Sequence, residues 1–237
     1  MKSLQRHLWR NFPPVWIHSP EKSVKSHPHY AAGKAGDSDS AYQLVKDCLS
    51  LEVMDSIHTA FELRKPVIAS AHAIERDGVN AIPEVLADFL GMHLGWQVDS
   101  SIVQSNIVAH TGADGFSRLA RQARFEGSVE LGEAYFLVDD FIGQGGTLAN
   151  LRSFLISKGA DVIGASVLTG KPFSANLRLT AETLELLRTK HGNELEIWWR
   201  TTFDFGYECL TESEARYLVH TPTIDRIRDR IAAALQV

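Results

Sequence analysis

The sequence predicts an α/β fold, in which a parallel, twisted sheet is flanked by helices. Short apolar runs typical of buried strands alternate with longer segments whose apolar residues recur at helical spacing. The 237 residues, 44% of them hydrophobic, are enough for one sizeable core with an attached subdomain. Because strands that alternate with helices form parallel sheets, a ligand is expected over the carboxyl ends of the strands, at a topological switch.

The first part of the chain is predicted to form an arm followed by helices. Residues 1–36 look irregular and contain four prolines. Asp37 or Ser38 is expected to cap a first helix, and residues 53–61 form a second apolar face at helical spacing. We therefore treat residues 1–63 as an N-terminal unit that packs on a core.

Residues 64–237 are predicted to form that core, closed by two C-terminal helices. The expected strands cover residues 66–71, 102–106, 135–138, 162–169 and 195–200. The expected helices cover residues 82–90, 147–158, 181–190, the segment after the capping-box pattern Thr211-Glu-Ser-Glu214, and 224–235. The polar segment 110–133 is long for a connection between elements, which indicates a functional loop or lid.

The segment Tyr135–Thr147 carries the clearest functional signal. Its apolar strand ends at Asp139 and Asp140, and three glycines then free the backbone before Thr147, which is expected to cap the next helix. A glycine-rich turn that leads into a helix N-terminus directs several N–H groups at one spot and suits a phosphate dianion. The two carboxylates need a different partner: sugar hydroxyls, a bound Mg²⁺ or a developing positive charge would each fit.

Two better-known glycine loops do not match this segment. A Walker A loop requires a lysine before its Ser/Thr, and here Gly146 precedes Thr147. The dinucleotide fingerprint would need a third glycine where Leu148 stands. The sequence therefore indicates a phosphate site of another kind beside two acids.

The order of four apolar residues, two acids and a loop closing in Gly-Gly-Thr resembles the motif with which type I phosphoribosyltransferases bind 5-phosphoribosyl 1-pyrophosphate (PRPP). The resemblance implies that Asp139 and Asp140 hold the 2′ and 3′ hydroxyls of the ribose. It also implies that Gly143, Gln144, Gly145, Gly146 and Thr147 bind the 5′-phosphate. The implied fold adds a hood, built from the terminal segments, that covers the acceptor base.

The resemblance extends to other segments. His72, Arg76 and Gly78 correspond to the turn that holds pyrophosphate, and guanidinium groups suit phosphate oxygens. His110 and Arg118 belong to a segment that corresponds to a loop closing over the reacting centre. The implied catalytic set is Asp139, Asp140, Arg76, Arg118 and His110.

The acceptor base is harder to derive. Trp199 and Phe203 lie where aromatic side chains of the family stack on it. Purine enzymes of the family often carry an acid three positions after the acid pair, but this chain has Gly143 there. The resemblance thus names the donor and leaves the acceptor open.

The predicted function is a PRPP-dependent transfer that joins a nitrogenous base to ribose 5-phosphate and releases pyrophosphate. Mg²⁺ is expected to arrive with PRPP, near Asp139 and Asp140, and no metal site of the protein's own is predicted. An alternative is a regulator that binds PRPP or a nucleotide without turnover, or the effector of a defence-type system. A third hypothesis is a nucleic-acid-binding face formed by Arg118, Arg121 and Arg124.

Composition narrows the partners. A formal charge of −5 gives no global basic footprint for nucleic acid or an anionic membrane. No apolar run approaches transmembrane length, and no apolar stretch typical of a signal peptide follows Lys2, Arg6 and Arg10. We therefore expect a cytoplasmic protein, and the resemblance implies a homodimer.

Overall fold

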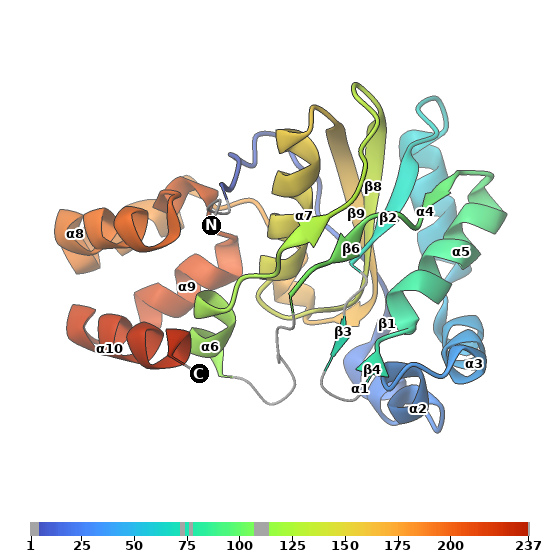
Figure 1. Cartoon of the computed structure of the whole chain (residues 1–237), viewed down its shortest axis with the longest axis horizontal. Helices are drawn as coiled ribbons and strands as arrows, with labels where there is room; N and C mark the ends of the chain where they lie inside the picture. Colours follow the sequence, from blue (N-terminus) through green and yellow to red (C-terminus); the bar gives the residue numbers. More distant parts are fainter. Residues whose placement is uncertain (1–4, 72–73, 76–77, 107–113, 237) are drawn as a thin grey trace.

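The computed structural model describes residues 5–71, 74–75, 78–106 and 114–236, and it confirms the α/β class. The strands of its main sheet are β1 (Trp16–Pro20), β2 (Val67–Ser70), β5 (Val98–Asp99), β8 (Ala134–Ile142) and β9 (Asp161–Gly170). All pairs are parallel, and the order is β1-β9-β8-β2-β5 (Figure 1). The chain moves outward from β2 to β5 in one direction and from β8 to β9 in the other. The topological switch therefore lies between β2 and β8.

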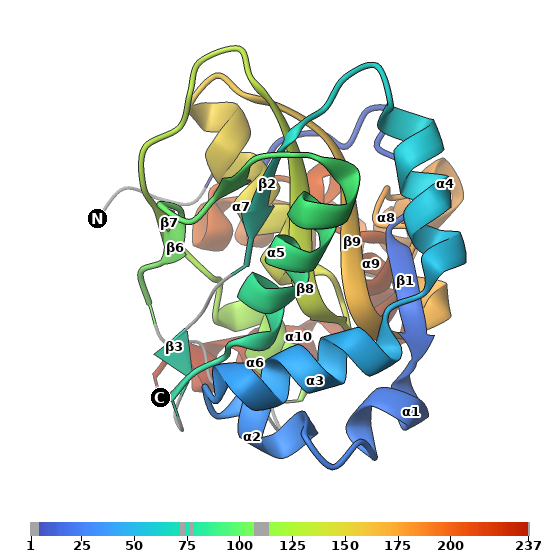
Figure 2. The same ribbon diagram turned by 90° about the vertical axis from the view of Figure 1, so that its right-hand side faces the viewer.

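Helices cover both faces of the sheet (Figures 1 and 2). One face packs against α3 (Ser38–Cys48), α4 (Leu51–Phe61) and α5 (Ile82–Leu94). The other face packs against α7 (Gly146–Ser157) and against buried side chains of the N-terminal arm, among them Trp9. Each face therefore has its own hydrophobic core, as expected for a parallel sheet.

A helical lobe lies beyond α7 (Figure 1). It is built from α6 (Gly115–Ala120), α8 (Ala181–Phe203), α9 (Glu212–His220) and α10 (Ile224–Leu235), which share a third core. The remaining elements are short: α1 (Glu21–Lys25), α2 (Tyr30–Lys34), the antiparallel pairs β3 (Ile74–Glu75) with β4 (Gly78–Val79) and β6 (Val103–Gln104) with β7 (Phe125–Glu126), and the 3₁₀ turns η1 (Pro172–Ser174) and η2 (Tyr207–Cys209). Within the described residues, no helix has the length and apolar composition needed to cross a membrane.

Two strand predictions are wrong. Residues 195–200 continue α8, which bends at Gly192 instead of ending near residue 190. The buried side chains Leu195, Trp199 and Phe203 recur every four residues, so helical packing overrides the strand preference of aromatic residues. Residues 102–106 do not join the main sheet, because only β6 forms there and it pairs with β7.

The arm that looked irregular contributes an edge strand. In β1, Trp16 to Pro20 pairs with the outer side of β9. Proline is tolerated there because its nitrogen has no N–H to donate and an edge strand leaves one side unpaired. The division at residue 63 remains a prediction, but part of the arm belongs to the sheet.

His18 of β1 makes stability depend on pH. Its ring is 6% exposed, and its Nδ1 accepts a hydrogen bond from the Ser50 N–H at 3.3 Å. Burial lowers the pKa of His18 to about 4. Because the unfolded chain binds the proton more readily, stability is fully present above about pH 6.5 and is lost as pH falls toward 4.

We expect chemical unfolding to report a loss of up to about 3 kcal/mol between pH 7 and pH 4 that His18→Leu reduces. His58→Leu makes the same chemical change at an exposed position of α4 and serves as the matched control. An unaltered profile in His18→Leu would show that His18 is not the group responsible.

Candidate functional site

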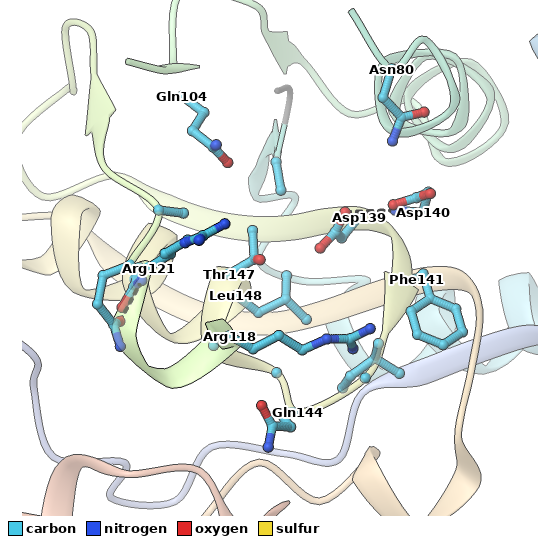
Figure 3. A pocket seen from close by; sticks show the side chains of 18 of the residues that line it. Asn80, Gln104, Arg118, Arg121, Asp139, Asp140, Phe141, Gln144, Thr147 and Leu148 are labelled. Carbon is cyan, nitrogen blue, oxygen red and sulfur yellow. Dashed lines mark hydrogen bonds between the residues drawn. The ribbon is translucent and has the colours of Figure 1, made fainter. Parts of the chain in front are cut away.

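A pocket of about 220 Å³ opens at the carboxyl ends of β2 and β8, where the topological switch lies (Figure 3). Ala71, the residue after β2, forms one wall, and Asp139 and Asp140 of β8 form another. The segment Gly143–Thr147, hereafter the phosphate loop, completes the floor. The structure therefore brings the predicted acid pair and the predicted phosphate loop into one cavity.

Both terminal segments contribute walls. Lys25, Tyr30 and Lys34 enter from α1 and α2, which lie beside the carboxyl ends of the strands (Figure 2). Glu214 enters from α9. The pocket is thus enclosed by parts of the chain that lie far apart in sequence, in the manner expected of a hood.

The two acids are buried side by side, each 7% exposed. The backbone N–H of Asp140 donates to Oδ1 of Asp139 at 2.8 Å, and Nζ of Lys34 donates to Oδ2 of Asp140 at 2.8 Å. Burial, and then the charge of Asp140, raise the pKa of Asp139 well above its ordinary value. Burial also opposes ionisation of Asp140, but the Lys34 ammonium and hydrogen bonds from Lys34, Asp139 and Asn80 lower its pKa. Asp139 is therefore the member of the pair that takes up a proton more readily, and Asp140 the member that ionises more readily.

The phosphate loop turns through a left-handed residue. Gly145 has φ 81° and is the N-cap of α7, and Gly146 is the first helical residue. The prediction that Thr147 caps this helix is wrong, because Thr147 is the second residue of α7 and its side chain faces the pocket (Figure 3). The first turn of α7 leaves backbone N–H groups without helical partners, and they lie beside the cavity.

The loop is fixed from behind by α9. The hydroxyl of Thr211 donates to the carbonyl oxygen of Gln144 at 2.6 Å. Thr211 and Glu214 also form the predicted capping box of α9. A side chain at Gly145 would collide with Leu177. Glycine is therefore required at position 145 by its dihedral angle and by its packing.

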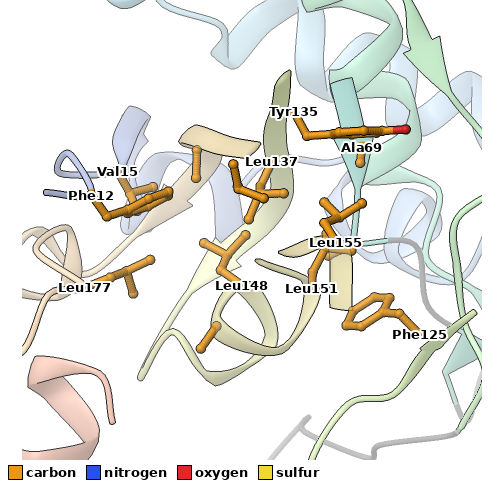
Figure 4. Packing of buried hydrophobic residues seen from close by; sticks show 14 of the residues in the cluster. Phe12, Val15, Ala69, Phe125, Tyr135, Leu137, Leu148, Leu151, Leu155 and Leu177 are labelled. Carbon is orange, nitrogen blue, oxygen red and sulfur yellow. The ribbon is translucent and has the colours of Figure 1, made fainter. Parts of the chain in front are cut away.

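The helix that carries the loop is anchored in the core. Leu148, Leu151 and Leu155 of α7 point toward Leu137 of β8 and the residues around it (Figure 4). All four side chains are at most 1% exposed. The start of α7 is therefore held rigidly against the strand that carries the acids.

Arg118 is the predicted catalytic arginine that the structure places at this site. It extends from α6 along the phosphate loop (Figure 3). A Cβ added to Gly143 would lie 2.5 Å from Nη1 of Arg118, so the absence of a side chain at position 143 makes room for the guanidinium. Gln104 and Arg121 line the same side of the cavity.

Two predicted base-stacking residues do not line the described pocket. Trp199 and Phe203 are buried in the core of the helical lobe, 0% and 9% exposed, and stacking on a base would require that core to open. Gly78 is the first residue of β4. His72, Arg76 and His110 lie outside the described residues.

Sequence reasoning missed the lysines of the N-terminal segment. Lys34 pairs with Asp140, and Nζ of Lys25 lies 4.5 Å from the ring centroid of Phe141. No motif surrounds either lysine, so no local signal marked them. Across the part of the chain that the structure describes, no group of three or more His, Cys, Asp or Glu side chains is arranged to hold a metal ion.

No protein-family model matches the chain. It is 38% identical over 230 residues to the Escherichia coli protein TraN, covering 97% of this chain and 51% of TraN. It is 34% identical over 158 residues to an uncharacterised protein of Haemophilus influenzae, covering 66% of this chain and 35% of that protein. The chain thus spans about half or less of these relatives.

Similar solved structures include adenine phosphoribosyltransferases. One matches 56% of this chain and 71% of its own at 16% identity and a TM-score of 0.39. The enzyme from Saccharomyces cerevisiae matches 64% and 74% at 14% identity and a TM-score of 0.36. The enzyme from Leishmania tarentolae matches 80% and 92% at 16% identity and a TM-score of 0.34. With likenesses this distant, function has to come from this chain's own residues.

Proposed function

We propose that this protein binds PRPP with Mg²⁺ and transfers its phosphoribosyl group to a nitrogenous acceptor, releasing pyrophosphate. One observation carries the proposal: two adjacent buried acids and a glycine loop at the start of α7 line a single pocket at the topological switch. Phosphate and vicinal hydroxyls are the two ends of a ribose 5-phosphate, and these two groups of residues complement them.

The roles follow from the geometry. The N–H groups at the start of α7 and the Thr147 hydroxyl bind the 5′-phosphate, while Asp139 and Asp140 accept hydrogen bonds from the ribose hydroxyls. The lone pair of an acceptor nitrogen forms a bond to ribose C1. The C1–O bond to pyrophosphate breaks, and its electron pair leaves with the pyrophosphate; a proton carried by the acceptor nitrogen passes to water.

Positive charge develops on the ribose as the C1–O bond breaks. The buried acid pair stabilises this charge, and Arg118, which runs along the phosphate loop, supplies a cation for phosphate oxygens of the ligand. The adjacent carboxylates of Asp139 and Asp140 fit Mg²⁺, which binds proteins through one or two carboxylates together with substrate phosphates. Mg²⁺ bound in this way would neutralise charge on the leaving pyrophosphate.

A PRPP-binding regulator is the second candidate, and the Lys34 ion pair favours it. Asp140 is already paired with a residue of α2, so a ligand that takes Asp140 must displace or share Lys34. Binding would then be coupled to the position of the N-terminal segment. A coupling of this kind is what a sensor requires.

Calorimetry with Mg²⁺ and PRPP, ribose 5-phosphate or pyrophosphate tests the proposal, together with pyrophosphate release in the presence of a panel of acceptors. We expect PRPP to bind more tightly than either of its halves. Thr147→Val should weaken the binding of ribose 5-phosphate and leave the binding of pyrophosphate unchanged. Pyrophosphate binding is therefore the internal control. PRPP binding without release from any acceptor would favour the regulator, and no PRPP binding would refute both.

A further inference from the structure

A second hollow adjoins the candidate site and shares Arg118, Gly143 and Gln144 with it. It encloses about 430 Å³ between α9, η1 and the phosphate loop. A molecule in this hollow would contact the loop at Gly143 and Gln144. The two cavities are therefore placed to hold two reactants next to each other.

The hollow is cationic although the chain as a whole is acidic. Arg118, Lys171 and Arg216 line it together with His220, and none of the described residues that line it carries a carboxylate. Within the described residues, the side chains of Lys171 and Arg216 form no ion pair with an acid, and both are exposed. Permanent cations that converge in one hollow create a local potential that attracts anions.

The same hollow offers flat apolar surfaces. Phe173 of η1 is 60% exposed, and Nζ of Lys171 lies 5.8 Å from its ring centroid. Tyr217 of α9 packs edge-on against Phe116, with ring centroids 5.0 Å apart, and keeps part of its surface in the hollow. Gly115 permits this position, because a side chain there would overlap the Tyr217 ring.

Cations and exposed aromatic rings together select one ligand chemistry. We infer that the basic hollow binds the acceptor and that the acceptor is a planar aromatic acid, whose carboxylate or phosphate contacts Arg216 and Lys171. This inference rests on the proposed function and specifies its second substrate. An uncharged base would leave Lys171 and Arg216 without an anionic partner, whereas an aromatic acid contacts both these cations and the rings.

The test compares matched acids and amides. Pyridine- and pyrimidine-carboxylates are each paired with their carboxamides, and phenyl phosphate supplies the phosphate arm. Binding is measured by calorimetry on the full chain, with and without Mg²⁺ and PRPP, and pyrophosphate release is measured with each heteroaromatic pair. We expect an acid to bind and react at least about tenfold better than its amide, as one or two charge-assisted hydrogen bonds would give. Tighter binding of phenyl phosphate than of the carboxylates would identify phosphate as the anionic group.

Variants separate this inference from the proposed function. Arg216→Gln and Lys171→Gln should each weaken acid binding by about fivefold to tenfold and leave PRPP binding unchanged. Lys46→Gln removes one exposed charge from α3, away from the hollow (Figure 1), and should change neither.

Two results would overturn the inference while PRPP binding stands. One is that the amides bind and react as well as the acids, and the other is that acid binding is unchanged in both Arg216→Gln and Lys171→Gln. The inference would also be overturned if PRPP binds but no heteroaromatic acid or amide causes release of pyrophosphate. Acid binding without PRPP binding would overturn the acceptor role together with the proposed function.

Discussion

Replacing Asp140 with asparagine is expected to weaken Mg²⁺-PRPP binding by about a hundredfold. The pKa of Asp140 is lowered and that of Asp139 is raised, so Asp140 is the member of the pair that more readily supplies a negative charge to a ribose hydroxyl or to Mg²⁺. A hydrogen bond to a charged group contributes about 1.5 to 3 kcal/mol, and the weakening of one or two such bonds to the ligand accounts for the expected change. Calorimetric titration of wild type and Asp140→Asn measures it directly.

The same substitution should leave the fold nearly intact. Asp140→Asn removes the ion pair with Lys34, which costs stability, but it also removes the cost of burying the charge of Asp140. These effects oppose each other, and we expect the free energy of unfolding to change by no more than about 1 kcal/mol. A loss of binding in a variant of normal stability would therefore report on the site.

Asp161→Asn is the matched control for this prediction. Asp161 opens β9, at the end of the sheet opposite the site, and its exposed side chain pairs with Arg64 at 2.7 Å. Asp161→Asn makes the same chemical change as Asp140→Asn, but we expect it to leave the affinity for PRPP at the wild-type value. Undiminished PRPP affinity in Asp140→Asn would remove Asp140 from the proposed role.

The part of the site that the sequence predicts is the part encoded locally. Strand, acid pair, glycine turn and helix follow one another within Tyr135–Thr147, so their order along the chain fixes their neighbourhood in space. The β8 strand, the α7 helix and the position at a topological switch are all confirmed. Only the cap differs, because the left-handed turn at Gly145 starts α7 before Thr147.

The rest of the site depends on interactions between distant residues. Lys34 and Asp140 are 106 positions apart, and nothing near Lys34 in the sequence indicates its partner. Arg118 reaches the phosphate loop because Gly143 leaves space for it, a relation that appears only when α6 packs beside the loop. Interactions of this kind are set by tertiary packing and have no periodicity or motif.

Trp199 illustrates the converse error. The aromatic run around Trp199 favoured a strand, since aromatic residues prefer strands, and the family resemblance implied a stacking role. In the structure, the indole is fully buried against Phe203 at 4.3 Å between ring centroids, inside the lobe of α8, α9 and α10. The position of Trp199 is set by burial in a helical core. Composition alone does not distinguish such a core residue from one on a binding surface.

Replacing Arg6 with glutamine is expected to destabilise the protein by about 3 to 5 kcal/mol, the cost of breaking a buried ion pair from one side. Nη1 of Arg6 donates to Oε2 of Glu214 at 2.6 Å, and the two side chains are 1% and 2% exposed. Arg6 also donates to Asn150 of α7 at 2.7 Å and to Gln122 at 2.8 Å. One arm residue thus joins α7 and α9 behind the phosphate loop, and urea unfolding would measure its contribution.

A double variant separates the charge from the packing. After Arg6→Gln, the carboxylate of Glu214 stays buried without its cation, so adding Glu214→Gln should restore at least about 1 kcal/mol. Arg64→Gln is the matched control, because its pair with Asp161 is about half exposed and should contribute less than about 1 kcal/mol. If Arg6→Gln were no more harmful than Arg64→Gln, the arm would not be anchored by this pair. The phosphate loop would then have to be held by Thr211 and the core of α7 alone.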